Sequence, residues 1–305
     1  RPKSVCCCST MILSTISKRI VLSRAAQSVF TPKRHTRPLS SVNDDPKIVK
    51  ESTEKIYDGQ AKDWARDTPS LLSDYSARPF VLEKCGDVRG LRILDLGCGE
   101  GYVGRKLINM GCGPITGIDI SPEMIKNAEN IGKERGFQNA RYISSDVLEY
   151  LNELETGGEE KVDLIIAVFL FNYVDAEYMT KVLSKARELL VEEGRFIFTV
   201  PHPSLPFMKK DKFPFYFDAT DKGYFSGRDI EFEGEIWRLD RKAVRVRCVH
   251  KTFEDYFDAF TAAGFTDMPE VREMCVSDEH LKIDEEFFGP LQDLPLHVMF
   301  ELCKK

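Results

Sequence analysis

The chain has 305 residues, 42% of them hydrophobic, which is enough for a substantial core in one large domain or two small ones. Its net charge is −6, but residues 1–43 carry +8 and no acidic residue, so residues 44–305 carry −14. An acidic body of this kind argues against nonspecific binding to nucleic acid or to an anionic membrane. The nine cysteines form no CxxC pair and no cluster with His at metal-ligand spacing, which predicts free thiols and no metal site.

Residues 1–43 are rich in Ser, Thr and Arg and include the apolar run MILSTISKRIVL. Lys18 and Arg19 interrupt this run, which is too short to span a membrane. The composition is typical of an organelle transit peptide, and RHTRPLSS near its end favours a mitochondrion over a plastid. The alternative is a disordered basic tail. Either reading leaves residues 44–305 as the folded domain.

The segment from Pro46 to Cys85 is predicted to be helical. In KIYDGQAKDWARD, Tyr57 and Trp64 are seven residues apart, so they would share one face of a helix. These aromatic rings either cover a ligand or pack the helix onto the rest of the domain. A second helix is expected from Pro69 to Cys85.

A glycine loop follows the first predicted strand, Leu91 to Leu96. Gly97, Gly99 and Gly101 stand at every second position, where glycine lets the backbone turn sharply and approach a ligand closely. A helical pattern begins at Tyr102. Strand, glycine loop and helix together open a nucleotide-binding α/β unit. Because the second and third of these glycines, with Gly104, also match GxGxxG, an NAD(P)-dependent oxidoreductase is an alternative.

Further strands and helices alternate along the rest of the chain. The sequence predicts strands at 115–120, 140–145, 162–169, 194–200, 269–276 and 296–303, and helices that start at Ser121-Pro122, span 175–190 and span 252–263. Such alternation predicts an α/β fold with N-terminal helices and a doubly wound, mostly parallel, Rossmann-like sheet of seven strands. Ligands bind beyond the carboxyl ends of such strands, where Asp95, Asp119 and Asp146 would lie.

Residues 202–250 interrupt this alternation with many aromatic residues and frequent Gly and Pro. We expect an insertion of short antiparallel strands after strand five that caps the substrate site. The alternative is a hairpin that buries its own aromatic side chains.

The stretch from Asp95 to Gly101 resembles motif I of the class I S-adenosylmethionine-dependent methyltransferases, in which an acid precedes the first glycine of GxGxG by two residues. KIYDGQAKDWARD resembles the N-terminal element of small-molecule members of that family, the methyltransferase type 11/12-like enzymes. The resemblance covers about residues 50–303. It implies S-adenosylmethionine as the cofactor, S-adenosylhomocysteine as the product, and no metal.

The resemblance also implies roles for the three acids. Asp95 would anchor the ammonium group of the cofactor, often through water. Asp119 would accept both ribose hydroxyls, and Asp146 would accept from the adenine amino group while the N–H of Val147 meets a ring nitrogen. For Asp119 and Asp146, a helix N-cap is the alternative role. The full expected cofactor set is Tyr57, Trp64, Asp95, Gly97, Cys98, Gly99, Gly101, Tyr102, Asp119, Ile120, Met124, Asp146, Val147 and Val168.

His202, directly after strand five, is the candidate general base for an oxygen acceptor, because many small-molecule members carry His-Pro here. A turn histidine between two prolines is the alternative. The expected substrate residues are Asn172, Tyr173, Trp237, Arg245, Arg247 and His250. The two arginines would receive a carboxylate on the acceptor, unless they lie on a solvated edge strand. The FNYV sequence after strand four differs from N/D-P-P-Y/F, which disfavours methylation of amino groups on nucleic-acid bases.

The sequence thus predicts in-line methyl transfer to an O, S or N atom of a small organic acceptor. The alternatives are the oxidoreductase and a non-catalytic cofactor-binding subunit of a methyltransferase complex. We expect a small-molecule partner, no nucleic acid and no membrane insertion, and the oligomeric state stays open.

Overall fold

The computed structural model describes residues 54–55, 58–59, 64, 66, 68–157, 161–208 and 211–305. Two units divide the chain, Arg1–Asp44 and Asp45–Lys305, and every described residue belongs to the second. The predictions for residues 1–43 and for Tyr57 therefore fall outside the described residues.

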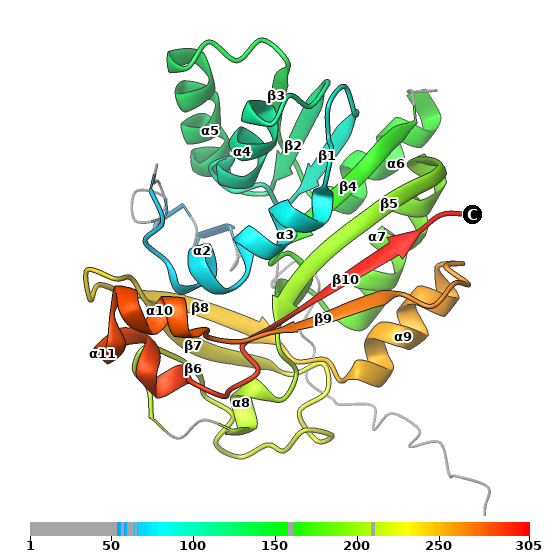
Figure 1. The fold of residues 1–305 in the computed structure, drawn as a ribbon. Coiled ribbons are helices and arrows are strands. Elements are labelled where there is room, and N and C mark those ends of the chain that lie inside the picture. Colours follow the sequence, from blue (N-terminus) through cyan, green and yellow to red (C-terminus); the bar gives the residue numbers. More distant parts are fainter. Residues whose placement is uncertain are drawn as a thin grey trace, which may run out of the picture. The chain divides into compact units, whose positions relative to one another are not determined.

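A seven-stranded sheet forms the centre of the second unit (Figure 1). Its strands are β1 (Ile93–Leu96), β2 (Ile115–Asp119), β3 (Ala140–Ser144), β4 (Val162–Val168), β5 (Leu190–Pro201), β9 (Glu270–Met274) and β10 (His297–Cys303). They lie in the order β3-β2-β1-β4-β5-β10-β9. The first five are parallel, and β10 runs antiparallel to both of its neighbours. The predicted α/β fold with a mostly parallel seven-stranded sheet is confirmed.

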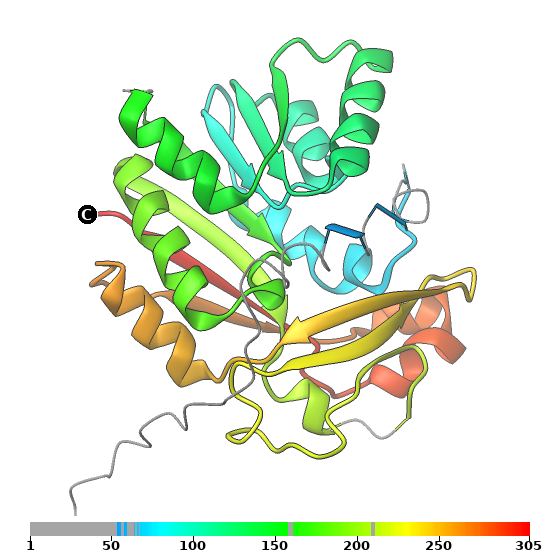
Figure 2. The ribbon, with the colours of Figure 1, turned by 180° about the vertical axis from the view of Figure 1, so that it is seen from behind.

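Helices cover both faces of the sheet, which is why the central strands are apolar on both sides. One hydrophobic cluster joins the sheet to α6 (Val147–Gly157), α7 (Ala176–Leu189) and α9 (Phe253–Ala262), which lie in front of it in Figure 2. A second cluster joins the opposite face to α3 (Arg78–Cys85) and α4 (Tyr102–Asn109). The carboxyl ends of the parallel strands are thereby left for the loops that carry the acids.

Helix caps set most of the predicted boundaries. Ser121 caps α5 (Pro122–Glu134) by accepting from the Met124 N–H, and Asp175 caps α7 by accepting from the Tyr178 N–H. Thr252 and Asp255 form a capping box at α9. Each cap satisfies N–H groups that the first helical turn leaves without partners, so these starts agree with the sequence to within a residue.

The single helix predicted from Pro69 to Cys85 is wrong. The segment forms α2 (Leu72–Ser76) and then α3, with a break at Ala77, whose φ of −139° is not helical. Pro79 explains the break, because its ring removes an N–H donor and restricts the residues before it. The break matters for the site, since Asp74 on one side and Arg78 on the other meet across it.

The insertion contains α8 (Leu205–Met208) and a three-stranded antiparallel sheet of β6 (Phe215–Phe217), β7 (Glu231–Trp237) and β8 (Ala243–Val249). One face of this sheet packs against α11 (Glu285–Phe288) and the turn at Gly289–Leu291, beside α10 (Asp278–Ile283) (Figure 1). Leu71 bridges to Arg238 at the end of β7. The aromatic insertion therefore shares a core with the N-terminal segment and the C-terminal helices, and does not pack only on itself.

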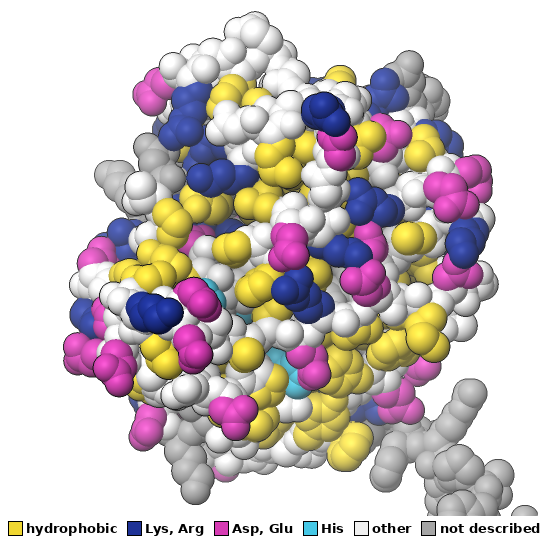
Figure 3. Space-filling model, in the orientation of Figure 1, with side chains coloured by type: hydrophobic (Ala, Val, Ile, Leu, Met, Phe, Trp, Pro, Cys, Tyr) yellow, Lys and Arg dark blue, Asp and Glu magenta, His cyan; other side chains and the backbone are white. Residues whose placement is uncertain are grey.

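Acidic and basic side chains are interspersed over the face shown in Figure 3, so this face presents no field of a single sign. Within the described ranges, no helix is long and apolar enough to cross a membrane. Nor do three or more His, Cys, Asp or Glu side chains of the described part of the chain come together as metal ligands.

Candidate active site

The glycine loop between β1 and α4 depends on three left-handed residues, since φ is 70° at Gly97, 56° at Gly99 and 79° at Gly101. A Cβ on Gly97 would lie 3.2 Å from the side chain of Leu170, and one on Gly101 would lie 3.1 Å from Oη of Tyr142. Apart from its chain neighbours, no atom of the described residues lies within 4 Å of the Cβ position of Gly99. Two glycines thus allow tight packing, while the middle one presents bare backbone to open space that a ligand can approach.

Asp119, at the end of β2, is tied to this loop. Its Oδ2 accepts from the N–H of Gly99 at 2.8 Å, and its Oδ1 accepts from the N–H of Ser121 at 3.0 Å. Burial raises the pKa of Asp119, and the nearby Asp58 carboxylate adds to this rise. The two hydrogen bonds from the backbone partly offset it. Each carboxylate oxygen can accept a further hydrogen bond, so the side chain is suited to two hydroxyl donors.

Asp95, at the end of β1, is buried with 3% of its surface exposed. Burial and the Asp119 carboxylate raise the pKa of Asp95 to about 7, although the guanidinium of Arg78 and a hydrogen bond from the Gly104 backbone oppose the rise. A carboxyl group in this state ionises when a cation binds beside it. The site therefore favours a ligand that brings a positive charge to Asp95.

Asp146, after β3, caps helix α6. Its Oδ1 accepts from the N–H groups of Leu148 and Glu149 at 3.0 and 3.1 Å, and its Oδ2 accepts from the hydroxyl of Tyr178 at 2.9 Å. Burial and the Asp146 carboxylate raise the pKa of Tyr178, so that hydroxyl stays a donor. The N-cap alternative is what the structure shows, and contact of Asp146 and Val147 with adenine stays a prediction.

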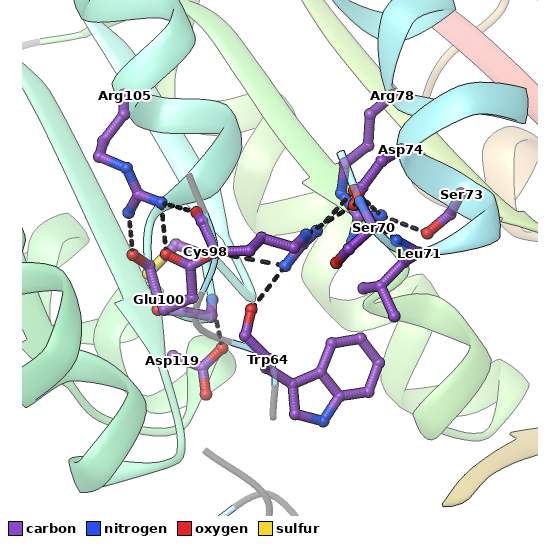
Figure 4. A network of polar contacts seen from close by, with 12 residues as sticks. Trp64, Ser70, Leu71, Ser73, Asp74, Arg78, Cys98, Glu100, Arg105 and Asp119 are labelled. Carbon is purple, nitrogen blue, oxygen red and sulfur yellow. Dashed lines mark hydrogen bonds and ion pairs between the residues drawn. The ribbon is translucent and has the colours of Figure 1, made fainter. Parts of the chain in front are cut away.

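A buried cluster of charges lies next to the glycine loop (Figure 4). Arg66 donates to both oxygens of Asp74 at 2.7 Å and to Glu100 at 3.3 Å. Arg105 pairs with Glu100 at 2.5 Å, and Arg78 donates to Asp74 at 3.2 Å. Their side chains are between 0% and 11% exposed. Glu100 belongs to the loop itself, so the cluster fixes the loop to α2 and α3.

Among the described residues, this cluster comprises three guanidinium groups and two carboxylates. Burial lowers the pKa of Arg78 to about 10, which still leaves it positively charged at neutral pH. Asp74 is shared between two arginines and also accepts from the N–H groups of Ser70 and Leu71. Because buried charges are stable only when they are balanced, the excess positive charge next to Asp95 suits a ligand carboxylate.

The other expected cofactor residues lie in or beside the ends of β1, β2 and β4. Tyr102 is buried under the guanidinium of Arg66, which is 4.3 Å from its ring centre, and Met124 and Val168 are buried. Cys98 packs on Gly117, where a Cβ would lie 2.9 Å from its sulfur, and burial raises the pKa of its thiol. Ile120 follows Asp119 and is half-buried. Trp64 packs against the hydrophobic cluster of the insertion.

His202 follows β5 but turns toward the β9 edge of the sheet. Its Nδ1 accepts from the N–H of Ser204 at 3.1 Å, so Nε2 carries the proton of the neutral ring and donates to Glu273 at 2.7 Å. Burial lowers the pKa of His202, while Glu273 opposes the change. Because both nitrogens are engaged, action as a general base requires one of these bonds to open, and that role stays a prediction.

Asn172 and Tyr173 form part of a short 3₁₀ turn, Phe171–Tyr173, after β4. Asn172 is buried, and within the described part of the chain its Oδ1 accepts no hydrogen bond. The ammonium group of Lys251, also buried, donates to the carbonyls of Phe171, Val174 and Val249. Lys251, which the sequence placed near Arg245 and Arg247, thus fixes the turn to the end of β8.

The insertion places the remaining expected substrate residues apart from one another. Arg245 is exposed, whereas Arg247 is buried and pairs with Glu231 at 2.8 Å. His250 is buried among aromatic rings, and its Nε2 donates to the carbonyl of Tyr224 at 2.9 Å. Trp237 lies edge-on to Phe213. The joint carboxylate site of Arg245 and Arg247 stays a prediction, because one is exposed and the other is already paired.

The sequence did not indicate the roles of Arg66, Arg78 and Glu100. Arg66 and Arg78 stand in DWARD and SARP, where nothing in a single sequence shows that they meet the glycine loop. The only available signal was an acid inside that loop, Glu100, which needs a partner when it is buried.

Comparison with known proteins agrees with this geometry. A family described as "Methyltransferase domain" matches residues 87–228. The chain is 27% identical over 201 residues to aklanonic acid methyltransferase DauC of Streptomyces sp. (strain C5), covering 62% of this chain and 80% of that protein. It is 30% identical over 139 residues to a protein of Haemophilus influenzae, covering 45% of this chain and only 53%, about half, of that relative.

Among solved structures, the fold is similar to that of magnesium protoporphyrin IX methyltransferase from Synechocystis PCC 6803 with bound S-adenosylhomocysteine. The TM-score is 0.55 and the identity 15%, over 84% of this chain and all of that one. The glycine loop, the acids at the ends of β1 and β2 and these matches lead to one conclusion. Residues 87–228 match a methyltransferase domain, and the chain has the fold of the S-adenosylmethionine-dependent methyltransferases.

Proposed function

We propose that the protein transfers a methyl group from S-adenosylmethionine to a small organic acceptor. The observation that carries this proposal is that the buried carboxyl group of Asp95, in the strand that leads into the glycine loop, lies within the electrostatic influence of the Arg78 guanidinium. The methionine end of the cofactor carries an ammonium and a carboxylate group. Asp95 would hold the first and Arg78 the second, which would balance the surplus positive charge of the cluster.

The adenosine end would lie at β2. Asp119 would accept both ribose hydroxyls, and its bonds to Gly99 and Ser121 keep its carboxylate fixed before a ligand arrives. When bound, the cofactor supplies an activated methyl group on a positively charged sulfur. The contribution of the chain is to hold the acceptor in line with that group and to exclude water.

Asn172 would contact the acceptor, because its buried Oδ1 has no hydrogen-bond partner among the described residues and its turn follows β4 at the same edge of the sheet as Asp95. The insertion of residues 202–250 would cover the acceptor. An oxygen, sulfur or nitrogen nucleophile fits this description. Residues 1–43 would direct the chain to an organelle, with a mitochondrion favoured, and an import assay with isolated mitochondria tests this.

The Arg78→Gln variant tests the proposed cofactor site. We expect S-adenosylhomocysteine to bind about 10- to 100-fold more weakly, because a buried ion pair is lost. Methylthioadenosine, which lacks the amino-acid end, should bind as it does to the wild type. Titration calorimetry measures both affinities.

Arg89→Gln is the matched control, since the side chain of Arg89 is 78% exposed and pairs with the exposed Asp87 two residues away. Equal weakening of both ligands by Arg78→Gln would mean that Arg78 only maintains the fold of the site. A screen of organelle metabolites with isotope-labelled methyl donor then identifies the acceptor, and no transfer to any acceptor would favour a non-catalytic subunit.

A further inference from the structure

Phe169, directly after β4, has an unusual backbone conformation, with φ at 64°. The other described non-glycine residues with positive φ are Glu193, Asp229, Arg241 and Asp293, all of them polar. A bulky aromatic residue is rare in the left-handed region, and such a residue costs about 1–3 kcal/mol and persists where the surroundings require it. The N–H of Phe169 donates to the carbonyl of Thr199 at 2.9 Å, which holds the strained residue to the neighbouring strand.

The position of Phe169 is fixed from the side of the glycine loop. The next residue, Leu170, packs where a Cβ of Gly97 would be, at 3.2 Å. The guanidinium of Arg78 lies 5.3 Å from the centre of the Phe169 ring. The same guanidinium also acts electrostatically on the carboxyl group of Asp95, so the ring lies beside a charged group of the proposed cofactor site.

The other side of the ring meets the C-terminal strand and the insertion. His297 on β10 lies edge-on to Phe169, with ring centres 5.2 Å apart, and stacks on Phe215 of β6. Burial, Arg78 and His202 lower the pKa of His297 to about 3, so its ring is uncharged. Phe169 therefore contacts the charged guanidinium of Arg78 and the uncharged ring of His297, which in turn stacks on Phe215 of the insertion.

We propose that Phe169 is a positioning residue for methyl transfer, whose ring contacts the positively charged sulfur of the cofactor. The inference rests on the proposed function. An aromatic face attracts a cation, so the ring favours the sulfonium of S-adenosylmethionine over the uncharged sulfide of S-adenosylhomocysteine. The half-buried ring leaves part of its surface for this contact. The strained backbone is retained because an extended residue would turn the ring away from the guanidinium of Arg78.

The test compares the affinities of S-adenosylmethionine and S-adenosylhomocysteine in the full chain by titration calorimetry. Phe169→Leu keeps apolar bulk but removes the aromatic face, so we expect S-adenosylmethionine alone to bind about 3- to 20-fold more weakly. Phe169→Tyr should retain the wild-type ratio of the two affinities. Phe257→Leu is the control, because Phe257 is an exposed aromatic residue on α9.

Phe169→Gly provides a second test, since glycine adopts the same backbone without strain. We expect this variant to remain folded and to show the same loss for S-adenosylmethionine alone. Equal weakening of both ligands, or no change for either in Phe169→Leu, would overturn the proposal and assign the ring to packing. If wild-type protein bound neither ligand, the proposed function itself would fail, which is a different result.

Discussion

Replacing Asp95 with Asn should separate the stability of the fold from binding of the cofactor. Burial and Asp119 raise the pKa of Asp95 from 3.8 to about 7, so between these pH values the folded chain keeps a proton that the unfolded chain loses. Stability contributed by this group therefore falls as pH rises. Above pH 7 the loss is complete and amounts to about 4 kcal/mol, because one pKa unit corresponds to about 1.4 kcal/mol.

Asparagine carries no charge and keeps an oxygen that can accept from the Gly104 N–H. We therefore expect Asp95→Asn to be more stable than the wild type by up to about 4 kcal/mol at pH 8, and to differ little near pH 4. Urea unfolding of the unliganded proteins at several pH values measures this difference. Asp163→Asn is a control, since Asp163 accepts from the backbone N–H of Arg92, directly before β1, and is only half-buried.

Binding should change in the opposite direction. In the wild type, the affinity for S-adenosylhomocysteine should fall about tenfold for each pH unit below 7, because Asp95 must lose its proton to meet the ammonium group. The variant should bind much more weakly and without this dependence. A variant less stable than the wild type at pH 8, or a wild-type affinity that is constant from pH 5.5 to 8, would refute the reasoning.

Two further variants test the adenosine and acceptor sides. Asp119→Ala should weaken S-adenosylhomocysteine by about 2–3 kcal/mol with the fold intact, and an unchanged calorimetric affinity would remove Asp119 from the site. His202→Ala should slow turnover about tenfold or less, with a flat pH profile, because both ring nitrogens are already paired. A loss of about 10²–10⁴-fold, with a wild-type rate that falls below about pH 6.5, would instead show that His202 removes a proton from a hydroxyl acceptor.

Local patterns in the sequence were sufficient for much of the fold. Apolar runs and helix caps such as Ser121 and Thr252 act within a few residues, so they predicted the strands and helix starts. The break at Pro79 was also a local signal, and it was overlooked. The residues of the site that depend on distant partners were different. The link from Arg66 to Glu100 spans 34 residues, and the contact of Phe169 with His297 joins β4 to β10.

The protonation and hydrogen bonding of the site residues could not be predicted from the sequence either, because they depend on burial. The pKa of Asp95 depends on the desolvation that α3, α4 and the sheet produce together, and the pairing of both His202 nitrogens depends on Glu273 in another strand. The sequence could place Asp95, Asp119 and His202 at strand ends. Which of these side chains is protonated, and which already has hydrogen-bond partners, follows only from the packed structure.

The central claim is that the glycine loop and its two acids bind S-adenosylmethionine. Titration calorimetry of the purified chain with S-adenosylhomocysteine and with NADH, at pH 8, tests it most directly. We expect saturable one-to-one binding of S-adenosylhomocysteine and no binding of NADH. Binding of NADH without binding of S-adenosylhomocysteine would contradict it.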